Sequence, residues 1–209
     1  MSAPVTVSAS VSPGAAATPA RRRIDALVIG ASAGGIDALL RMLPALGSRF
    51  SFPVVIVLHM PGDRSSRLAE VFQQHLHCPV EQADDKASLL PGHIYFAPSG
   101  YHLSIENDYS FSLSQEEPLH FSRPAIDILM TSAADVYGRH LCGILLTGAS
   151  SDGAAGMAAI GKAGGLTVVQ DPDEAEIMTM PAAAIRLRAP DHILGLDAIR
   201  GWLTNLETM

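Results

Sequence analysis

Three polar residues of this 209-residue chain have types and surroundings that suit hydrolytic chemistry. Ser32 lies in GASAG, which fits the pattern G-x-S-x-G, where small flanking residues permit a tight strand-to-helix turn that presents a serine oxygen. His59 lies in VLHMP and Asp152 in TGASSDG. A serine, a histidine that takes its proton and an acid that orients the histidine are together the parts of a catalytic triad.

Each of the three residues also has a simpler interpretation. The glycines around Ser32 could form a dinucleotide loop, but that loop needs G-x-G-x-x-G, and Ser32 stands where the middle glycine should be. His59 could be a loop histidine held by a backbone carbonyl, and Asp152 could cap the helix that follows it. The order serine, histidine, acid also differs from that of standard α/β-hydrolases, which disfavours that fold.

The elements that must position these residues follow the alternation expected of an α/β fold with a parallel sheet. Short β-branched runs predict strands at about 24–29, 54–58, 141–146 and 166–169. Amphipathic stretches predict helices near 35–46, 65–76, 126–137, 154–163, 181–187 and 197–206. Further strands are expected at 94–97, 102–106 and 110–114, the last two forming an exposed antiparallel hairpin. The three polar residues then follow three separate strands, at the edge of the sheet where ligands gather.

Composition supports a single domain at about 24–209, because 48% of the residues are hydrophobic and only 17% are charged. Residues 1–23 are rich in Ala, Ser and Pro and lack acidic residues, so we expect a disordered tail. The net charge of −7 argues against binding to nucleic-acid phosphates or to an anionic membrane surface. Apolar runs are too short to span a bilayer.

The cysteines and histidines argue against a metal or another cofactor. Cys78 and Cys142 are too few for a disulfide framework or a cysteine-based zinc site, which favours a cytoplasmic setting. His75 and His77 are spaced closely enough to bind a metal, but no carboxylate or cysteine stands at ligand spacing. The remaining histidines are expected to be structural or exposed: His93, His102, His120, His140 and His192.

Six segments between residues 29 and 185 resemble, in the same order, the catalytic domain of the CheB-type chemotaxis protein-glutamate methylesterases. They read IGASAGGIDAL, VLHMP, LPGHIYFAPSGYHLSIE, SRPAIDILMTSAA, ILLTGASSDGAAGM and QDPDEAEIMTMPAAAI. The resemblance implies a three-layer, doubly wound, mostly parallel sheet with helices on both faces and an added antiparallel hairpin.

The same resemblance implies an activity and its site. The enzyme would remove methyl esters from glutamates of methyl-accepting chemotaxis receptors, release methanol and also deamidate receptor glutamines. Ser32 would be the nucleophile, His59 the base and Asp152 the orienting acid, while the backbone N–H groups of Ala33 and Ala149 would face the oxyanion. Neither a cofactor nor a metal is implied.

This chain departs from the family's pattern in three places. The family usually has Met where this chain has Ala149, and His where it has Ser122. A phosphorylation-receiver domain commonly precedes the catalytic domain and needs over 100 residues, whereas 23 residues precede the first predicted strand. We therefore expect an esterase that is constitutively active or controlled from outside the chain. The alternative is a weakly catalytic or non-catalytic module of the same fold that binds a receptor or a regulatory partner.

Overall fold

The computed structural model describes residues 23–47, 50–60 and 67–206. Their core is a seven-stranded sheet whose neighbouring strands all pair in parallel, in the order β3-β4-β2-β1-β7-β8-β9. The strands are β1 (Ala26–Ala31), β2 (Val54–Leu58), β3 (Val80–Gln82), β4 (Ile94–Phe96), β7 (Leu141–Leu145), β8 (Leu166–Gln170) and β9 (His192–Leu194). Every residue of β1, β2 and β7 is buried, as expected of central parallel strands covered on both faces.

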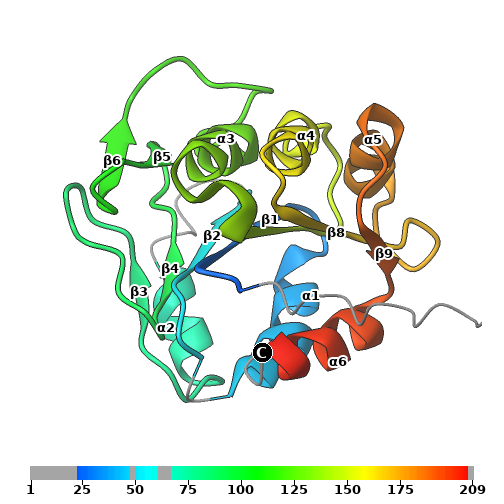
Figure 1. Ribbon diagram of the computed structural model, residues 1–209, viewed down its shortest axis with the longest axis horizontal. Helices are drawn as coiled ribbons and strands as arrows, with labels where there is room; N and C mark the ends of the chain where they lie inside the picture. Colours follow the sequence, from blue (N-terminus) through cyan, green and yellow to red (C-terminus); the bar gives the residue numbers. More distant parts are fainter. Residues whose placement is uncertain (1–22, 48–49, 61–66, 207–209) are drawn as a thin grey trace, which may run out of the picture.

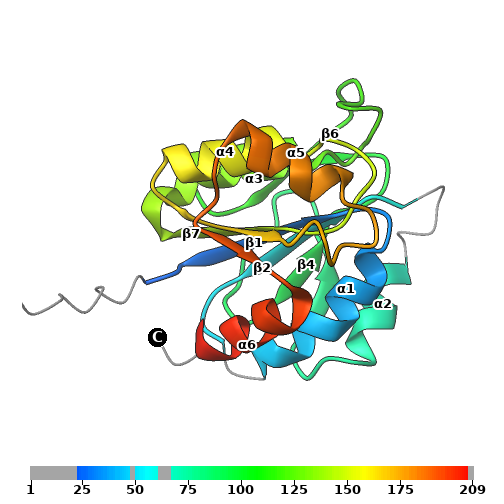
Figure 2. The same ribbon diagram turned by 90° about the vertical axis from the view of Figure 1, so that its right-hand side faces the viewer.

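Helices cover both faces of the sheet, which confirms the predicted three-layer α/β architecture (Figures 1 and 2). One layer holds α3 (Ile126–Tyr137), α4 (Ala154–Lys162) and α5 (Thr179–Leu187). The opposite layer holds α1 (Gly35–Met42), α2 (Leu68–Gln73) and α6 (Leu196–Leu206). Each layer packs its apolar side chains on its own face of the sheet, giving two separate buried clusters.

The strand order reverses at β1, and this reversal locates the site. From β1 the chain passes through α1 to β2 on one side, and it later returns through α3 to β7 on the other side. In open α/β sheets the crevice outside the carboxyl ends of the strands at such a reversal is the usual binding site. The segments that follow β1, β2 and β7 therefore meet there.

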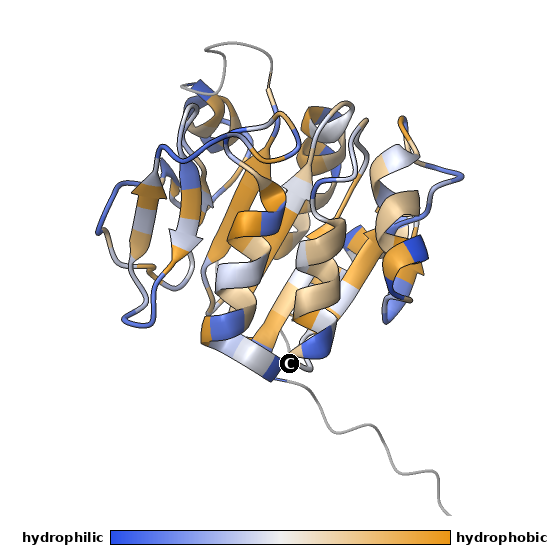
Figure 3. Ribbon diagram, turned by 90° about the horizontal axis from the view of Figure 1, so that it is seen from above, coloured by the Kyte–Doolittle hydropathy of each residue, from blue (hydrophilic) through white to orange (hydrophobic). Residues whose placement is uncertain are grey.

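The antiparallel hairpin is present, formed by β5 (His102–Ile105) and β6 (Phe111–Ser114). The expectation that it would be exposed is wrong, because Leu103, Ile105 and Phe111 are buried. One face of the hairpin joins the apolar cluster around α3, and only the other face is open to solvent. Figure 3 shows the hairpin beside the helical layer, with hydrophobic residues on its strands.

Other differences from the predicted elements have local causes. The helix expected at 35–46 ends as an α-helix at Met42 and continues as a 3₁₀ turn, because Pro44 has no N–H to continue the ladder. The helix expected at 65–76 is the shorter α2, and residues 61–66 lie outside the described part. Strands β3 and β9 have three residues each, too short for a periodic pattern.

The expected disordered tail falls almost entirely on residues 1–22, outside the described part of the chain. Arg23, which is described, forms an exposed ion pair with Asp25 at 2.6 Å. Among the described residues, no helix has the length and apolar character needed to cross a bilayer.

Candidate active site

Ser32 follows β1 in the tight turn that leads into α1. Its N–H donates to the carbonyl of Thr147 at 3.0 Å, which joins the end of β1 to the loop after β7. The turn needs a left-handed residue, and Gly34 supplies it with φ of 77°. A Cβ at Gly34 would also lie 2.7 Å from a carboxylate oxygen of Glu176. The strand, turn and helix predicted around G-x-S-x-G are therefore present.

Backbone N–H groups without partners lie near Ser32. Within the described part of the chain, the N–H groups of Ala33 and Ala149 find no hydrogen-bond acceptor, whereas that of Gly148 donates to Ile177 O at 3.1 Å. A Cβ on Gly148 would lie 2.9 Å from the Cβ of Ser32, so the glycine lets this loop pass directly beside the serine. Such donors suit an oxygen that gains negative charge during a reaction.

His59 follows β2 and is in register with Ser32, because the residues before them, Leu58 and Ala31, pair across the two strands. Its side chain is 12% exposed, and its Nε2 lies 2.9 Å from Oδ2 of Asp152. The ring is tilted, so that this N–H does not point straight at the oxygen. Nδ1 lies 3.5 Å from the hydroxyl of Ser122. The carboxylate at Nε2 favours the tautomer that leaves the Nδ1 lone pair free to take a proton.

Asp152 is completely buried, and its carboxylate is a cap for a distant helix. Oδ2 accepts the N–H of Ile126 at 2.7 Å, and Oδ1 accepts that of Asp127 at 2.9 Å; these are the first two residues of α3. The helix directly after Asp152, α4, is preceded by Gly153 and has no side-chain cap. The simpler interpretation as the cap of the following helix is therefore wrong, although the carboxylate does cap α3.

The environment of Asp152 favours its ionised form. Burial raises the pKa of this carboxyl, but the close contact with His59, the hydrogen bonds from the N–H groups of Asp127 and Ile126 and the charge of His59 outweigh burial and lower the pKa below its usual value. Hydrogen bonds to a carboxylate and a nearby positive charge both stabilise the charged form. Asp152 is therefore a permanent anion beside the imidazole.

A second buried carboxylate, Asp127, lies next to Asp152, and the sequence patterns did not single it out. Burial raises the pKa of Asp127, the N–H of Gly156 at 2.6 Å opposes that rise, and the charge of Asp152 adds to it. Nε2 of His120 lies 3.3 Å from Oδ2 of Asp127, so this histidine, expected to be merely structural or exposed, contacts the site. An Asp in the first turn of a helix is common, so the sequence around Asp127 did not indicate that it lies in the site.

Ligand atoms of His120, Asp127 and Asp152 lie within 4.8 Å of one another, as a metal site would require. Both carboxylates already accept backbone N–H groups, and Asp152 also faces His59. Their lone pairs are thus engaged in positioning the site.

The structure therefore places Ser32, His59 and Asp152 at one edge of the sheet, as the strand-end argument predicts. The His59–Asp152 contact is present, whereas no hydrogen bond joins Ser32 to His59 among the described residues. Catalytic hydrogen bonds are often long in a free enzyme and shorten when substrate binds. Behind the site, Thr147 ties the loops together: its N–H donates to Gln170 at 2.8 Å and its hydroxyl to Ala33 O at 2.9 Å.

Comparisons with known proteins identify the family of the chain. Residues 27–203 match the family model described as CheB methylesterase. A Leptospira interrogans protein named "Putative protein-glutamate methylesterase/protein-glutamine glutaminase" is 43% identical over 183 residues, which cover 88% of this chain and 95% of the relative. A Carboxydothermus hydrogenoformans relative, "Protein-glutamate methylesterase/protein-glutamine glutaminase 1", is 39% identical over 83% of this chain and 52% of its own length.

The fold agrees as well. The crystal structure of the Thermotoga maritima CheB methylesterase catalytic domain matches with a TM-score of 0.83 at 30% identity, covering 88% of this chain and 98% of that domain. The match therefore includes nearly all of a known catalytic domain, at an identity that supports common descent as well as a common fold. This chain belongs to the CheB methylesterase family.

Proposed function

We propose that this protein hydrolyses glutamate methyl esters on methyl-accepting chemotaxis receptors, with release of methanol, and that it also deamidates receptor glutamines. The observation that carries the proposal is the 2.9 Å contact between His59 Nε2 and Asp152 Oδ2, formed beside Ser32 at the strand reversal. The names of its relatives support the same two activities. No comparison favours the non-catalytic alternative.

In this proposal Ser32 is the nucleophile. Its Oγ attacks the ester carbon, and its proton moves to Nδ1 of His59, the nitrogen that faces away from Asp152. The buried Asp152 carboxylate stabilises the imidazolium that forms. The carbonyl oxygen of the ester gains negative charge, and in this proposal it accepts hydrogen bonds from the N–H groups of Ala33 and Ala149, which have no acceptor among the described residues.

The hydrolysis is completed in two stages, collapse of this tetrahedral intermediate to an acyl-enzyme and then hydrolysis of the acyl-enzyme. The C–O bond to the methoxy group breaks, His59 returns the proton to that oxygen, and methanol leaves an acyl group on Ser32. Water, deprotonated by His59, attacks the carbonyl carbon of this acyl group. The bond from that carbon to Ser32 Oγ then breaks, and His59 returns the proton to Oγ, which releases the glutamate carboxylate and restores the serine hydroxyl. A glutamine amide would react by the same route, with ammonia as the leaving group.

The two cysteines indicate the cellular compartment of the enzyme. Cys78 and Cys142 are both buried and unpaired, and burial raises the pKa of each thiol. We place the enzyme in the reducing cytoplasm, where such cysteines persist. The departures from the family pattern at Ala149 and Ser122 leave the proposed triad residues unchanged: the N–H of Ala149 is retained whatever its side chain, and Ser122 lies beside His59.

The test is methanol release from a methylated receptor by wild type and Ser32→Ala. Loss of the nucleophile is expected to lower kcat by at least about 10³-fold, because the residues of a triad act as a unit. Ammonia release from receptor glutamines should fall with it. Ser114→Ala is the matched control, since this half-buried serine of β6 makes no side-chain hydrogen bond among the described residues. Equal rates for wild type and Ser32→Ala would refute the proposal.

A further inference from the structure

A tight turn at residues 119–122 lies beside the site and has a strained backbone. The N–H of Leu119 donates to Ser122 O at 3.2 Å, and the N–H of Ser122 donates to Leu119 O at 2.9 Å. The two residues between them, His120 and Phe121, have φ of 51° and 60°. Left-handed backbone is unfavourable for a bulky residue, and such strain persists where the surroundings enforce it, often at functional sites.

The turn is attached to the site through two side chains. Nε2 of His120 lies 3.3 Å from Oδ2 of Asp127, whose own N–H donates to Asp152. The hydroxyl of Ser122 lies 3.5 Å from Nδ1 of His59 and equally far from the carbonyl of His120. The turn therefore has a contact with the carboxylate pair on one side and with the imidazole on the other.

The Ser122 contact falls on the nitrogen that the reaction needs. With Nε2 directed at Asp152, the lone pair of neutral His59 is on Nδ1, and this lone pair must take the proton of Ser32. Among the described residues, Ser122 is the hydrogen-bond partner of that nitrogen and Ser32 is not. The single hydrogen of the Ser122 hydroxyl can be directed to the carbonyl of His120 or to Nδ1 of His59, and when it is directed to Nδ1 it competes with the nucleophile for the same lone pair.

The side chain at the tip of the turn, Phe121, is a solvent-exposed aromatic ring. Phe121 is fully exposed, at 105% relative accessibility, and no other exposed large hydrophobic residue of the described part exceeds 59%. Phe121, Ser122 and His59 line one pocket of about 360 Å³, together with Met60 and Arg123. A substrate that fills this pocket would contact the ring, the Ser122 hydroxyl and the base together.

We propose that the turn at 119–122 senses the substrate: Phe121 contacts the polypeptide that carries the ester, and Ser122 occupies Nδ1 of His59 until that contact is made. The proposal rests on the proposed function, because it assumes that His59 is the base. The occupant that we propose for this pocket is a polypeptide with apolar side chains near the modified glutamate, since a fully exposed ring is stabilised by burial against such a surface. A small ester would reach Ser32 without touching the turn.

The experiment compares two substrates, a methylated receptor and p-nitrophenyl acetate. Phe121→Asn removes the ring but keeps the turn, because Asn tolerates the left-handed conformation. We expect kcat/KM on the receptor to fall by roughly ten-fold, the size of an aromatic contact in an interface, with the small ester changed by less than about two-fold. Tyr109→Asn is the matched control and should change neither rate.

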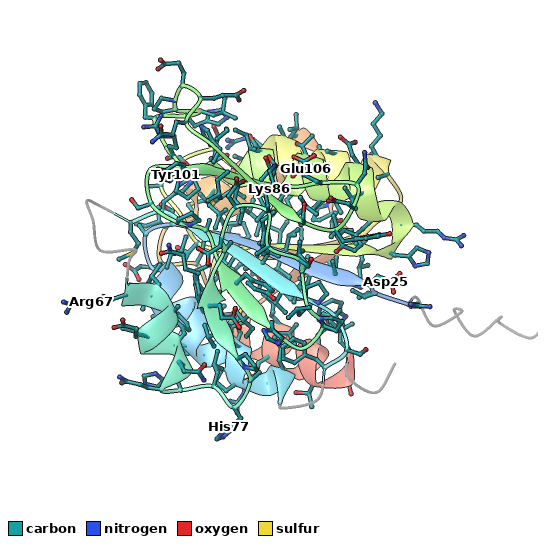
Figure 4. All side chains as sticks on the ribbon, turned by 90° about the vertical axis from the view of Figure 1, so that its left-hand side faces the viewer. Asp25, Arg67, His77, Lys86, Tyr101 and Glu106 are labelled. Atoms are coloured by element: carbon teal, nitrogen blue, oxygen red, sulfur yellow. The ribbon has the colours of Figure 1, made fainter. Side chains whose placement is uncertain are left out.

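Tyr109 suits this purpose because it has φ of 62°, is 52% exposed and lies at the other end of the hairpin. The residues His102 and Ser114 pair at the end nearest the turn at 119–122, whereas Tyr109 lies in the loop between β5 and β6. Figure 4 shows Tyr101, which precedes β5, and Glu106, which follows it, at opposite ends of this region.

A second variant tests the contact with the base. Ser122→Ala should raise the rate of Ser32 acylation by p-nitrophenyl acetate by about two- to five-fold, as expected for loss of one weak competing hydrogen bond. The same variant should change kcat on the receptor by less than about two-fold, because the receptor displaces Ser122. Ser122→Thr keeps the hydroxyl and should behave as wild type.

The outcomes separate the two proposals. If wild type hydrolyses neither ester faster than Ser32→Ala, the proposed function has failed. If wild type uses Ser32 but Phe121→Asn lowers both rates equally or neither, or if Ser122→Ala is no faster on the small ester, the sensing role alone is overturned. Thermal unfolding of each variant within about 2 °C of wild type would show that the fold is intact, since both side chains are peripheral to the core.

Discussion

Two helices begin at the same edge of the sheet, and a backbone N–H just before one of them differs in its partners from the first N–H groups of the other. At α1 the N–H of Ala33, just before the helix, has no acceptor among the described residues. At α3 the N–H groups of Ile126 and Asp127 both donate to Asp152. A helix N-terminus favours negative charge. The attraction of a helix N-terminus for negative charge therefore has two roles at this edge of the sheet. At α3 it stabilises the carboxylate of Asp152, and at α1 it would stabilise the oxyanion that exists only during the reaction.

Removing the permanent charge should have the largest effect. Asp152→Ala is expected to lower kcat for methanol release by about 10³- to 10⁴-fold, because His59 loses the group that orients it. It should also lower the free energy of unfolding by about 1–3 kcal/mol, because two buried N–H groups of α3 lose their acceptor. Methanol release and urea unfolding measure the two effects.

Asp152→Asn serves as the control for that loss, because its amide keeps an oxygen for one N–H of α3 but carries no charge. It should recover part of the stability and little of the activity. An Asn variant with nearly wild-type kcat would show that the cap, and not the charge, is what the site requires.

Removing the N–H of Ala149, the other donor without an acceptor among the described residues, should affect the rate alone. Replacing the residue at Ala149 with lactic acid converts the backbone amide to an ester and deletes its N–H. We expect kcat to fall by about 10²-fold, the usual effect of one oxyanion donor, with little change in unfolding. The same replacement at Ala163, whose N–H donates to Ala159 O within α4 at 2.9 Å, should lower stability and leave kcat unchanged.

Acid should weaken α3 through Asp152. The pKa of this carboxyl is lowered in the folded protein, so the stability that its charge provides is complete above the ordinary value of 3.8 and is lost as the pH falls through the lowered folded value. The difference in unfolding free energy between wild type and Asp152→Asn should therefore be constant at neutral pH and shrink below about pH 4. A difference that grows on acidification would contradict this sign.

The neighbouring Asp127 should respond in the opposite direction, with the smallest effect. Burial raises the pKa of Asp127, so its charge opposes folding once the pH exceeds the ordinary value. Asp127→Asn should therefore keep or raise stability at pH 7, by up to about 1 kcal/mol, since an amide oxygen can still accept the N–H of Gly156. A loss as large as that of Asp152→Ala would mean that the two carboxylates are equivalent.

Prediction from sequence succeeded where a local pattern determines the outcome. The apolar runs predict β2 to the residue, β7 to within one residue and β1 to within two residues at each end, and the small residues around Ser32 predict the turn. The hairpin was only partly predicted, because alternation identifies an antiparallel pair but not what covers one face. The contact between His120 and Asp127 could not be predicted from a sequence pattern. It joins a side chain in a turn to a side chain in the first turn of a helix, and their distance depends on the tertiary structure.

The sequence by itself determined the class of fold, because the alternation of strand and helix patterns is local to the chain. The resemblance of its six segments to a known family then implied the family and the three residues proposed as the triad. Only the tertiary structure decided that Asp152 caps α3, that Ser122 faces His59 and that the N–H groups of Ala33 and Ala149 have no acceptor among the described residues. The physical reason is that a hydrogen bond depends on distance and direction in space, and these are set when the ends of β1, β2 and β7 are brought together.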